Sequence, residues 1–212
     1  MRDIPVFTTE HGVASLTLKE IPYRGIAYVR IQSSLAPALL IDECIGFCRA
    51  VGAKKILATG HSCLEKYPLH STVIRMACPK ENLADTDASL FPIQAETMEL
   101  WREHYNNRMK DVDNASYMSV EDCKHMLARG GGYFIHRGDK LLGIGIAGGD
   151  KIDAVISLIP GAGRDVLLAL NHAVFSNVIS LEVASTNERA IRLYKSLGFI
   201  PIEECSRWYK IL

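Results

Sequence analysis

The stretch from Ile179 to Phe199 constrains the fold of this chain more than any other part of the sequence. It begins with an alternation in which Ile179, Leu181 and Val183 fall on one side and smaller or polar residues on the other. A period of two is typical of a strand with one buried face. Because Glu182 belongs to the second set, its carboxylate is expected to point away from the apolar face.

A short helix is predicted directly after this strand. Asn187 can cap its first turn, and Ser185 is the alternative because it stands three residues before Glu188, the spacing of a capping box. Gly198 suits a left-handed end to the helix. The apolar face between these ends consists of residues at helical spacing, Ala190, Leu193, Tyr194 and Leu197.

Three polar side chains therefore gather around one strand–helix junction: Glu182, Asn187 and Tyr194. Each also has an ordinary structural interpretation. Glu182 would lie at a solvated edge, Asn187 would only cap the helix, and Tyr194 would be a core tyrosine with a satisfied hydroxyl. Residue spacing alone leaves both interpretations open.

A second informative stretch is Ile159-Pro160-Gly161-Ala162-Gly163-Arg164, between a predicted strand and the apolar helical run Val166–Val174. A helix N-terminus has unpaired N–H groups and a partial positive charge, so it can bind phosphate. Small residues would let the backbone approach such a ligand. The spacing matches neither the Walker loop nor the Rossmann fingerprint. A phosphate-binding turn and a tight connection without a ligand are both consistent with it.

The segment before this turn is predicted to form a first strand, two helices and a meander. The first helix spans 94–109 and carries Trp101 and Tyr105 on an apolar stripe, and Ser119 caps the second. Turn residues separate three apolar runs, which predicts three antiparallel strands. These strands are 133–136, 141–147 and 152–159.

The first third of the chain is predicted to repeat part of this order. A hairpin over 13–31, a helix from Pro37 to Gly52 and a strand over 56–59 give the order β-β-α-β. We therefore predict two units, residues 1–70 and 71–212. The first is interpreted as a partial copy of the second, and an unrelated stabilising extension is the alternative.

Composition excludes several classes of protein. The 212 residues contain 24 Lys and Arg and 24 Asp and Glu, and a net charge of 0 argues against binding nucleic acid or membrane through bulk charge. No export signal or apolar span of bilayer length is apparent. The six cysteines lack paired metal-site spacings and are interpreted as reduced thiols. We expect a cytoplasmic protein without a metal, a nucleic-acid partner or a membrane partner.

The final strand–helix stretch resembles that of the GNAT N-acetyltransferases, and locally the bacterial ribosomal-protein alanine N-acetyltransferase branch. The resemblance implies an α/β (α+β) fold of the GNAT type, with a mixed, mostly antiparallel sheet flanked by helices and a partial GNAT-like unit before it. The match is dense in this stretch and thinner before it. The residues that carry it are Leu181-Glu182-Val183, Asn187, Ala190, Leu193-Tyr194 and Leu197-Gly198-Phe199.

In this family, the turn before the preceding helix reads Gln/Arg-x-x-Gly-x-Gly/Ala and holds the pyrophosphate of coenzyme A. Gly161 and Gly163 match its last two elements, whereas Leu158 stands where Gln or Arg is expected. Arg164 is a candidate to replace that charge. N–H groups around Leu158 and Ile159 are expected to bind the pantetheine and the acetyl oxygen. The implied cofactor-binding set is Leu158, Ile159, Gly161, Ala162, Gly163, Arg164 and Asn187.

The resemblance also implies that Glu182 is the general base and Tyr194 the general acid. An amine with a pKa of roughly 10 must lose a proton before it attacks, and a phenol is protonated at neutral pH. No cysteine lies near these residues in sequence, so a direct ternary complex is expected. The co-substrate is acetyl-CoA, and the acceptor is a primary amine of a small molecule or peptide.

Other assignments stay open at this level. The rival function is a non-catalytic acyl-CoA-binding or protein-interaction module that retains the fold, and Leu158 is its main support. A homodimer is compatible with either function. Trp101 or Tyr105 would line the acceptor site or form core. The acidic loop 111–114 would receive a basic substrate or remain solvated.

Overall fold

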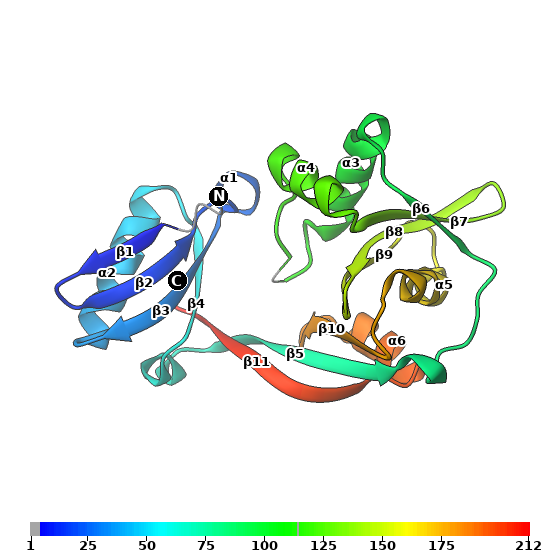
Figure 1. Ribbon diagram of the computed structural model, residues 1–212. Coiled ribbons are helices and arrows are strands. Elements are labelled where there is room, and N and C mark those ends of the chain that lie inside the picture. The colour runs from blue at the N-terminus through cyan, green and yellow to red at the C-terminus, as the bar shows by residue number, and fades with distance from the viewer. Residues whose placement is uncertain (1–4, 114) are drawn as a thin grey trace. The chain divides into compact units, whose positions relative to one another are not determined.

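The computed structural model describes residues 5–113 and 115–212, so residues 1–4 of the predicted first unit and Asn114 of the predicted loop lie outside it. The chain divides into two compact units (Figure 1). The first contains the described residues up to Val73 together with Glu204–Leu212, and the second contains Ile74–Glu203. Two strands, β5 (Leu69–Pro79) and β11 (Ile200–Lys210), begin in one unit and end in the other.

The first unit is a small sheet packed on one long helix. Strands β1, β2 and β3 are antiparallel neighbours, and β3 pairs in parallel with β4 after the crossover through helix α2. The end of β11 then pairs with β4. The elements are β1 (Val6–Thr9), β2 (Gly12–Thr17), α1 (Ile21–Arg24), β3 (Ile26–Ser34), α2 (Pro37–Ala50), β4 (Lys55–Thr59) and the 3-10 turn η1 (Ser62–Lys66).

The predicted hairpin and helix of this unit are confirmed, with differences in detail. The turn between β2 and β3 is itself a helical turn, closed by Gly25 at φ +68°. On α2, the apolar residues Phe47 and Val51 are exposed. Phe47 packs on Phe7 of β1, a strand that was not predicted, and Ile41 is buried in the core instead.

The second unit contains a sheet with the order β5-β10-β9-β8-β7-β6. The predicted meander is confirmed, because β7, β8 and β9 pair antiparallel, and β9 is parallel to β10. The elements after β5 are η2 (Lys80–Asn82), β6 (Ser89–Pro92), η3 (Ala95–Thr97), α3 (Met98–Met109), α4 (Val120–Arg129), β7 (Gly132–Arg137), β8 (Lys140–Gly148), β9 (Lys151–Ser157), α5 (Gly163–Leu170), η4 (Asn171–Ala173), β10 (Val178–Ala184) and α6 (Glu188–Ser196).

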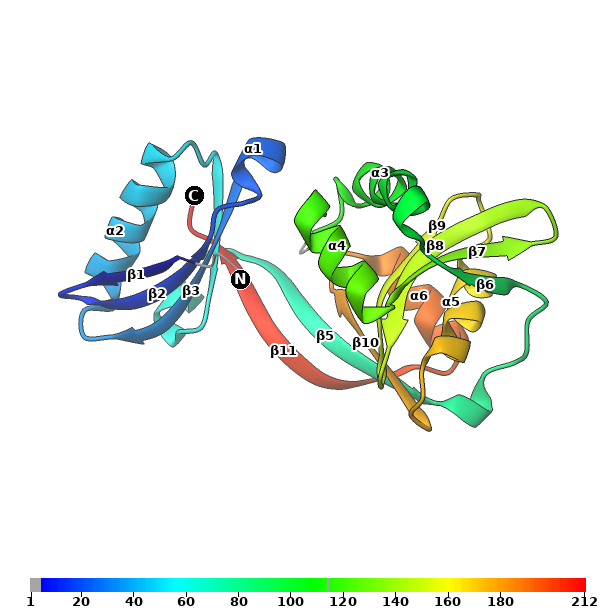
Figure 2. The same cartoon turned by 45° about the horizontal axis from the view of Figure 1, so that its top comes forward.

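Helices cover both faces of this sheet (Figures 1 and 2). One core lies under α5 and α6 and includes Leu167, Leu181 and Phe199. The other lies under α3 and α4 and includes Trp101 and Ile144. The sheet is therefore the middle of three layers, and strands β7, β8 and β9 contribute residues to both cores. None of the helices within the described ranges combines the length and apolarity needed to cross a bilayer.

Two glycines in β8 allow α5 to lie directly on the backbone of the sheet. A Cβ at Gly143 would come within 2.5 Å of Val166 Cγ2, and one at Gly145 within 2.4 Å of Leu170 Cδ1. Real Cβ atoms do not approach so closely, so side chains at these positions would push the helix away. The two glycines thus fix the distance between α5 and the sheet, and with it the position of the turn that precedes this helix.

We predict that Gly145→Ala lowers the free energy of unfolding by about 1–3 kcal/mol, because overpacking displaces a buried helix. Gly148→Ala is the matched control: it lies in the same strand, with nothing within 4 Å of its Cβ. Urea unfolding of both variants measures the difference. Equal stability of the two variants would contradict the packing argument.

Candidate active site

The strands β9 and β10 separate soon after they begin to pair. Their parallel ladder consists of Ser180↔Lys151 and Leu181↔Ile152, and the rest of β9, Asp153–Ser157, has no partner on β10 within the described residues. Figures 1 and 2 both show β10 diverging from β9. An edge of main-chain groups is therefore left open in the middle of the sheet.

A β-bulge accounts for this separation. Ile146 lies opposite Ala154 and Ala147 opposite Ile152, so Asp153 is an extra residue in β9. The bulge also reverses the alternation of side chains along β9. Ile152 points into the α5/α6 core, whereas Ala154, two residues later, belongs to the α3/α4 core. A bulge bends its strand and increases the local twist. Here it turns β9 away from β10.

The direction of the open groups follows from the pairing of β9 with β8. The N–H of Leu158 donates to the carbonyl of Leu142 at 2.9 Å. In an antiparallel pair, alternate residues bond to the same neighbour, so Ile156 also faces β8. The N–H and C=O groups of Val155 and Ser157 then point toward β10. The prediction named Leu158 as a donor to the cofactor, but its N–H is used within the sheet.

The turn after β9 leads directly into the N-terminus of α5. The N–H of Ala162 donates to the carbonyl of Ile159 at 3.4 Å, and Gly161 adopts φ +85°. A Cβ at Gly163 would meet Leu193 Cδ2 of α6 at 3.1 Å, so this position favours glycine by close packing. The first intrahelical bond comes from Val166. The preceding N–H groups therefore have no acceptor in their own helix.

The charges around this turn favour an anion. Asp165 in the first turn of α5 is paired with Arg137 at 2.8 Å, and Arg137 also contacts Asp87 at 2.7 Å. The negative charge that Asp165 brings to the helix N-terminus is thereby partly compensated, because Arg137 is shared between two carboxylates. Arg164 is exposed and has no carboxylate partner within the described residues. The structure places the predicted residues Ile159–Arg164 together in this one turn.

Glu182 lies on the face of β10 opposite the α5/α6 core. Its Oε1 accepts from Nη2 of Arg75 at 2.9 Å, and Nη1 of the same guanidinium contacts Glu203 at 2.5 Å. The three side chains come from neighbouring strands and are about half exposed. Sequence analysis missed Arg75 and Glu203. No local signal could reveal this contact, because Arg75 lies 107 residues before Glu182.

Tyr194 and Asn187 lie at the other side of β10, on α6. Tyr194 is 8% exposed in the α5/α6 core, and its hydroxyl has no hydrogen-bond partner in the described part of the chain. Burial raises the pKa of Tyr194 to about 12, so the phenol is protonated at neutral pH. Asn187 Oδ1 accepts from the N–H of Ala190 at 3.2 Å, which selects Asn187 over Ser185 as the helix cap.

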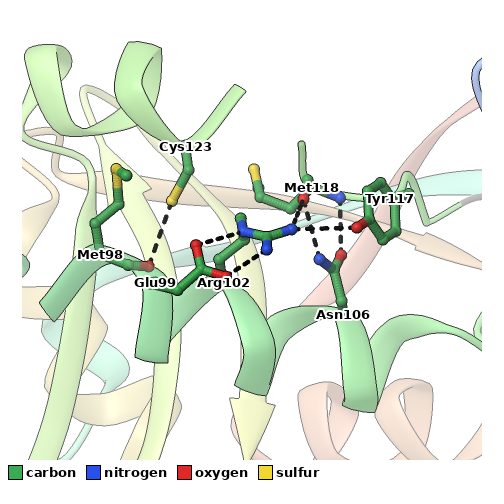
Figure 3. Close-up of polar contacts among 7 residues, drawn as sticks. All are labelled: Met98, Glu99, Arg102, Asn106, Tyr117, Met118 and Cys123. Carbon is green, nitrogen blue, oxygen red and sulfur yellow. Dashed lines mark hydrogen bonds and ion pairs between the residues drawn. The ribbon is translucent and has the colours of Figure 1, made fainter. Parts of the chain in front are cut away.

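The connection between α3 and α4 is fastened to α3 by side chains (Figure 3). The amide of Asn106 bonds both main-chain groups of Met118, at 2.8 and 3.0 Å. Arg102 contacts Glu99 and donates to the hydroxyl of Tyr117 at 3.1 Å. These contacts hold Tyr117 and Met118, just before α4, against α3. The connection lies beside the helix whose Trp101 is completely buried, and this tryptophan belongs to the core.

The cysteines and the metal-ligating side chains offer no alternative centre within the described ranges. All six cysteines are free, and no three His, Cys, Asp or Glu side chains are grouped to hold an ion there. Burial raises the pKa of Cys44 to about 12 and of Cys48 to about 11. Such thiols stay protonated at neutral pH and are poor nucleophiles.

No protein-family model and no curated protein sequence matches this chain. Solved structures do match it. A GCN5-related N-acetyltransferase from Sphaerobacter thermophilus aligns with a TM-score of 0.59 at 10% identity, over 93% of this chain and 75% of that one. An acetyltransferase of the GNAT family from Colwellia psychrerythraea aligns with a TM-score of 0.51 at 13% identity, over 97% and 83%. A protein of unknown function from Staphylococcus epidermidis aligns with a TM-score of 0.60 at 10% identity, over 99% and 94%.

These likenesses confirm the predicted fold. The protein has the mixed α+β architecture of the GNAT acyl-CoA N-acyltransferases. At such low identity the likeness extends to the fold alone. The local resemblance to the ribosomal-protein alanine N-acetyltransferase branch stays a prediction, as do the roles of the individual site residues.

We predict that Asn187→Ala lowers the free energy of unfolding by about 1 kcal/mol, because the first turn of α6 loses its cap. Asn187→Asp should restore most of the loss, since a carboxylate oxygen can accept from Ala190 and is favoured at a helix N-terminus. Thermal or urea unfolding checks both. If the Asp variant were as unstable as the Ala variant, the cap would not be the stabilising contact.

Proposed function

We propose that this protein transfers the acetyl group of acetyl-CoA to a primary amine in a direct ternary complex. The observation that carries the proposal is the open main-chain edge of β9 in a sheet of the GNAT fold. Main-chain N–H and C=O groups that a ligand covers require hydrogen-bond partners in that ligand. An extended amide-containing chain such as pantetheine can supply them in the way that an added strand does.

The residues around the edge fit such a ligand. Pantetheine would run along Val155 and Ser157, and the pyrophosphate would lie at the N–H groups of Gly163 and its neighbours. The glycines of the turn allow close approach, and nothing stands within 4 Å of a Cβ at Gly161. The amide nitrogen of Asn187 has no partner in the described part of the chain, so it is available for a contact with coenzyme A.

Glu182 and Tyr194 lie on opposite faces of β10, which suits the two proton transfers of the reaction. Glu182 would take the proton of the amine, directly or through water, on the α3/α4 face. Arg75 would hold that carboxylate in place. Tyr194 would act on the α5/α6 face, where the departing sulfur would lie. Acetyl-CoA supplies the activated thioester, and the acceptor would be a small molecule or a peptide.

The difference in pKa between Tyr194 and the leaving thiol limits what Tyr194 can contribute to the reaction. The pKa of Tyr194 is raised to about 12. Complete proton transfer from such a group to a thiolate of pKa about 8.5 is uphill by roughly 5 kcal/mol. A hydrogen bond to the developing thiolate needs no complete transfer. We therefore propose that Tyr194 acts mainly as a donor that stabilises the leaving sulfur.

A second candidate is a non-catalytic acyl-CoA-binding or interaction module. Leu158 favours it, because this side chain packs against the α3/α4 core where the family pattern has Gln or Arg. Acetyl-CoA binding without release of free thiol across a panel of amines would support this alternative. Amine-dependent thiol release would exclude it.

We predict that acetyl-CoA raises the melting temperature of the protein. A ligand that binds only the native state adds about 2.7 kcal/mol at a free concentration of 100 Kd, which corresponds to a shift of several degrees. Differential scanning fluorimetry at up to millimolar acetyl-CoA tests this, with adenosine as the control ligand. Absence of a shift would remove the proposed function.

We predict that Tyr194→Phe lowers kcat about 10- to 100-fold on an identified amine and leaves the affinity for acetyl-CoA nearly unchanged, because it removes one donor to the leaving group. Steady-state kinetics and the melting shift separate the two effects. A variant with normal kcat would show that Tyr194 is a core residue without a catalytic role.

A further inference from the structure

The guanidinium of Arg108 lies at the start of the turn that connects β9 to α5, although Arg108 is far from this turn in the sequence. Arg108 stands in the last turn of α3, and its Nη2 donates to the carbonyl of Leu158 at 2.5 Å. Leu158 is the residue that immediately precedes the turn Ile159–Ala162. A charge from the other helical layer is thus placed where β9 ends and the turn begins.

The electrostatic surroundings of Arg108 differ from those of three other arginines of this unit. Arg75, Arg102 and Arg137 each contact at least one carboxylate. Arg108 contacts only a neutral carbonyl within the described residues. A guanidinium has five N–H donors, so most of those on Arg108 remain available. Its positive charge is therefore not compensated by an ion pair.

The side chain at position 158 cannot supply this charge. Leu158 packs against the α3/α4 core, so its aliphatic side chain points into the protein while its carbonyl binds the guanidinium. Arg108 lies 50 residues before Leu158 in the chain and occupies, in space, the start of the same turn. The guanidinium of Arg108, on α3, therefore stands where the family pattern would have a Gln or Arg side chain at position 158.

We propose that Arg108 binds the pyrophosphate of acetyl-CoA together with the N–H groups at the N-terminus of α5. The inference rests on the proposed function and adds to it a residue outside the predicted turn. Guanidinium–phosphate contacts are charge-assisted and can be bidentate, and they weaken with salt where they are exposed. The rival explanation is structural: Arg108 only closes the end of β9 by its bond to Leu158.

The two explanations differ in the part of the ligand that they affect. A phosphate-binding role concerns coenzyme A but not pantetheine, which has no phosphate. A structural role at the end of β9 would affect both ligands, because pantetheine lies along that strand. Arg108→Gln keeps an N–H donor for the carbonyl of Leu158 and removes the charge. Arg108→Lys keeps a charge and removes the planar fork.

The experiment is calorimetric titration of the full chain with coenzyme A and, separately, with pantetheine, at low and at physiological salt. We expect Arg108→Gln to weaken coenzyme A binding about tenfold, to flatten its salt dependence and to leave pantetheine binding unchanged. Arg108→Lys should lose only part of the affinity. Arg129→Gln is the matched control, since Arg129 is an exposed arginine in the last turn of α4. It should bind both ligands as the wild type does.

Each other outcome overturns a defined part of the argument. Unchanged coenzyme A affinity in Arg108→Gln, with normal binding by the wild type, removes the role of Arg108 and leaves the proposed function intact. Equal weakening of both ligands assigns Arg108 to the structure of β9 and also refutes the proposal. Wild-type protein that binds neither ligand refutes the proposed function, and the role of Arg108 fails with it.

Discussion

The hydrogen bonds that β9 does not make to β10 are the constraint on which the site depends. Val155 and Ser157 are half-buried, and β10 offers their main-chain groups no partner within the described residues. The extra residue Asp153 opens this edge by bending β9, and Lys151 holds the carboxylate of Asp153 at 2.9 Å. The direction in which the main-chain groups of Val155 and Ser157 point is fixed, because the alternate residues of β9 bond to β8. An edge without a strand partner that is held in place is suited to a ligand with its own amide groups.

The first unit has the same topology with its bulge at a later point in the strand: Ile31 lies opposite Ala14 and Ser33 opposite Val13, so Gln32 is the extra residue of β3. There, too, a parallel pair is joined through a helix, from β3 through α2 to β4. Its parallel ladder runs over five pairs before that bulge, from Ile26↔Lys55 to Arg30↔Thr59, whereas the ladder of β9 and β10 has only two pairs. The helix begins at Pro37, which lacks an N–H, rather than at a glycine turn. The order of elements recurs in both units, whereas the early bulge that separates the parallel strands after two pairs belongs to the second.

Sequence reasoning succeeded where a structure is determined locally. The strand, cap and helix over 178–196 were predicted because alternation, the Asn187 cap and Gly198 all agree. It missed β6, which has only four residues, and β11, most of whose residues are exposed and show no alternation. It also missed the register shift at Asp153, since a bulge is a property of two strands and not of either sequence.

The same distinction applies to charge. The chain has a net charge of 0, which by itself suggests no anion-binding surface. The fold, however, pairs Arg75 and Arg137 with carboxylates and leaves Arg108 and Arg164 without a carboxylate partner in the described chain, both next to a helix N-terminus. Two guanidinium groups without a carboxylate partner therefore lie at one turn of a chain whose total charge is balanced. The proposed binding of a pyrophosphate thus depends on how the charges are paired and not on how many there are.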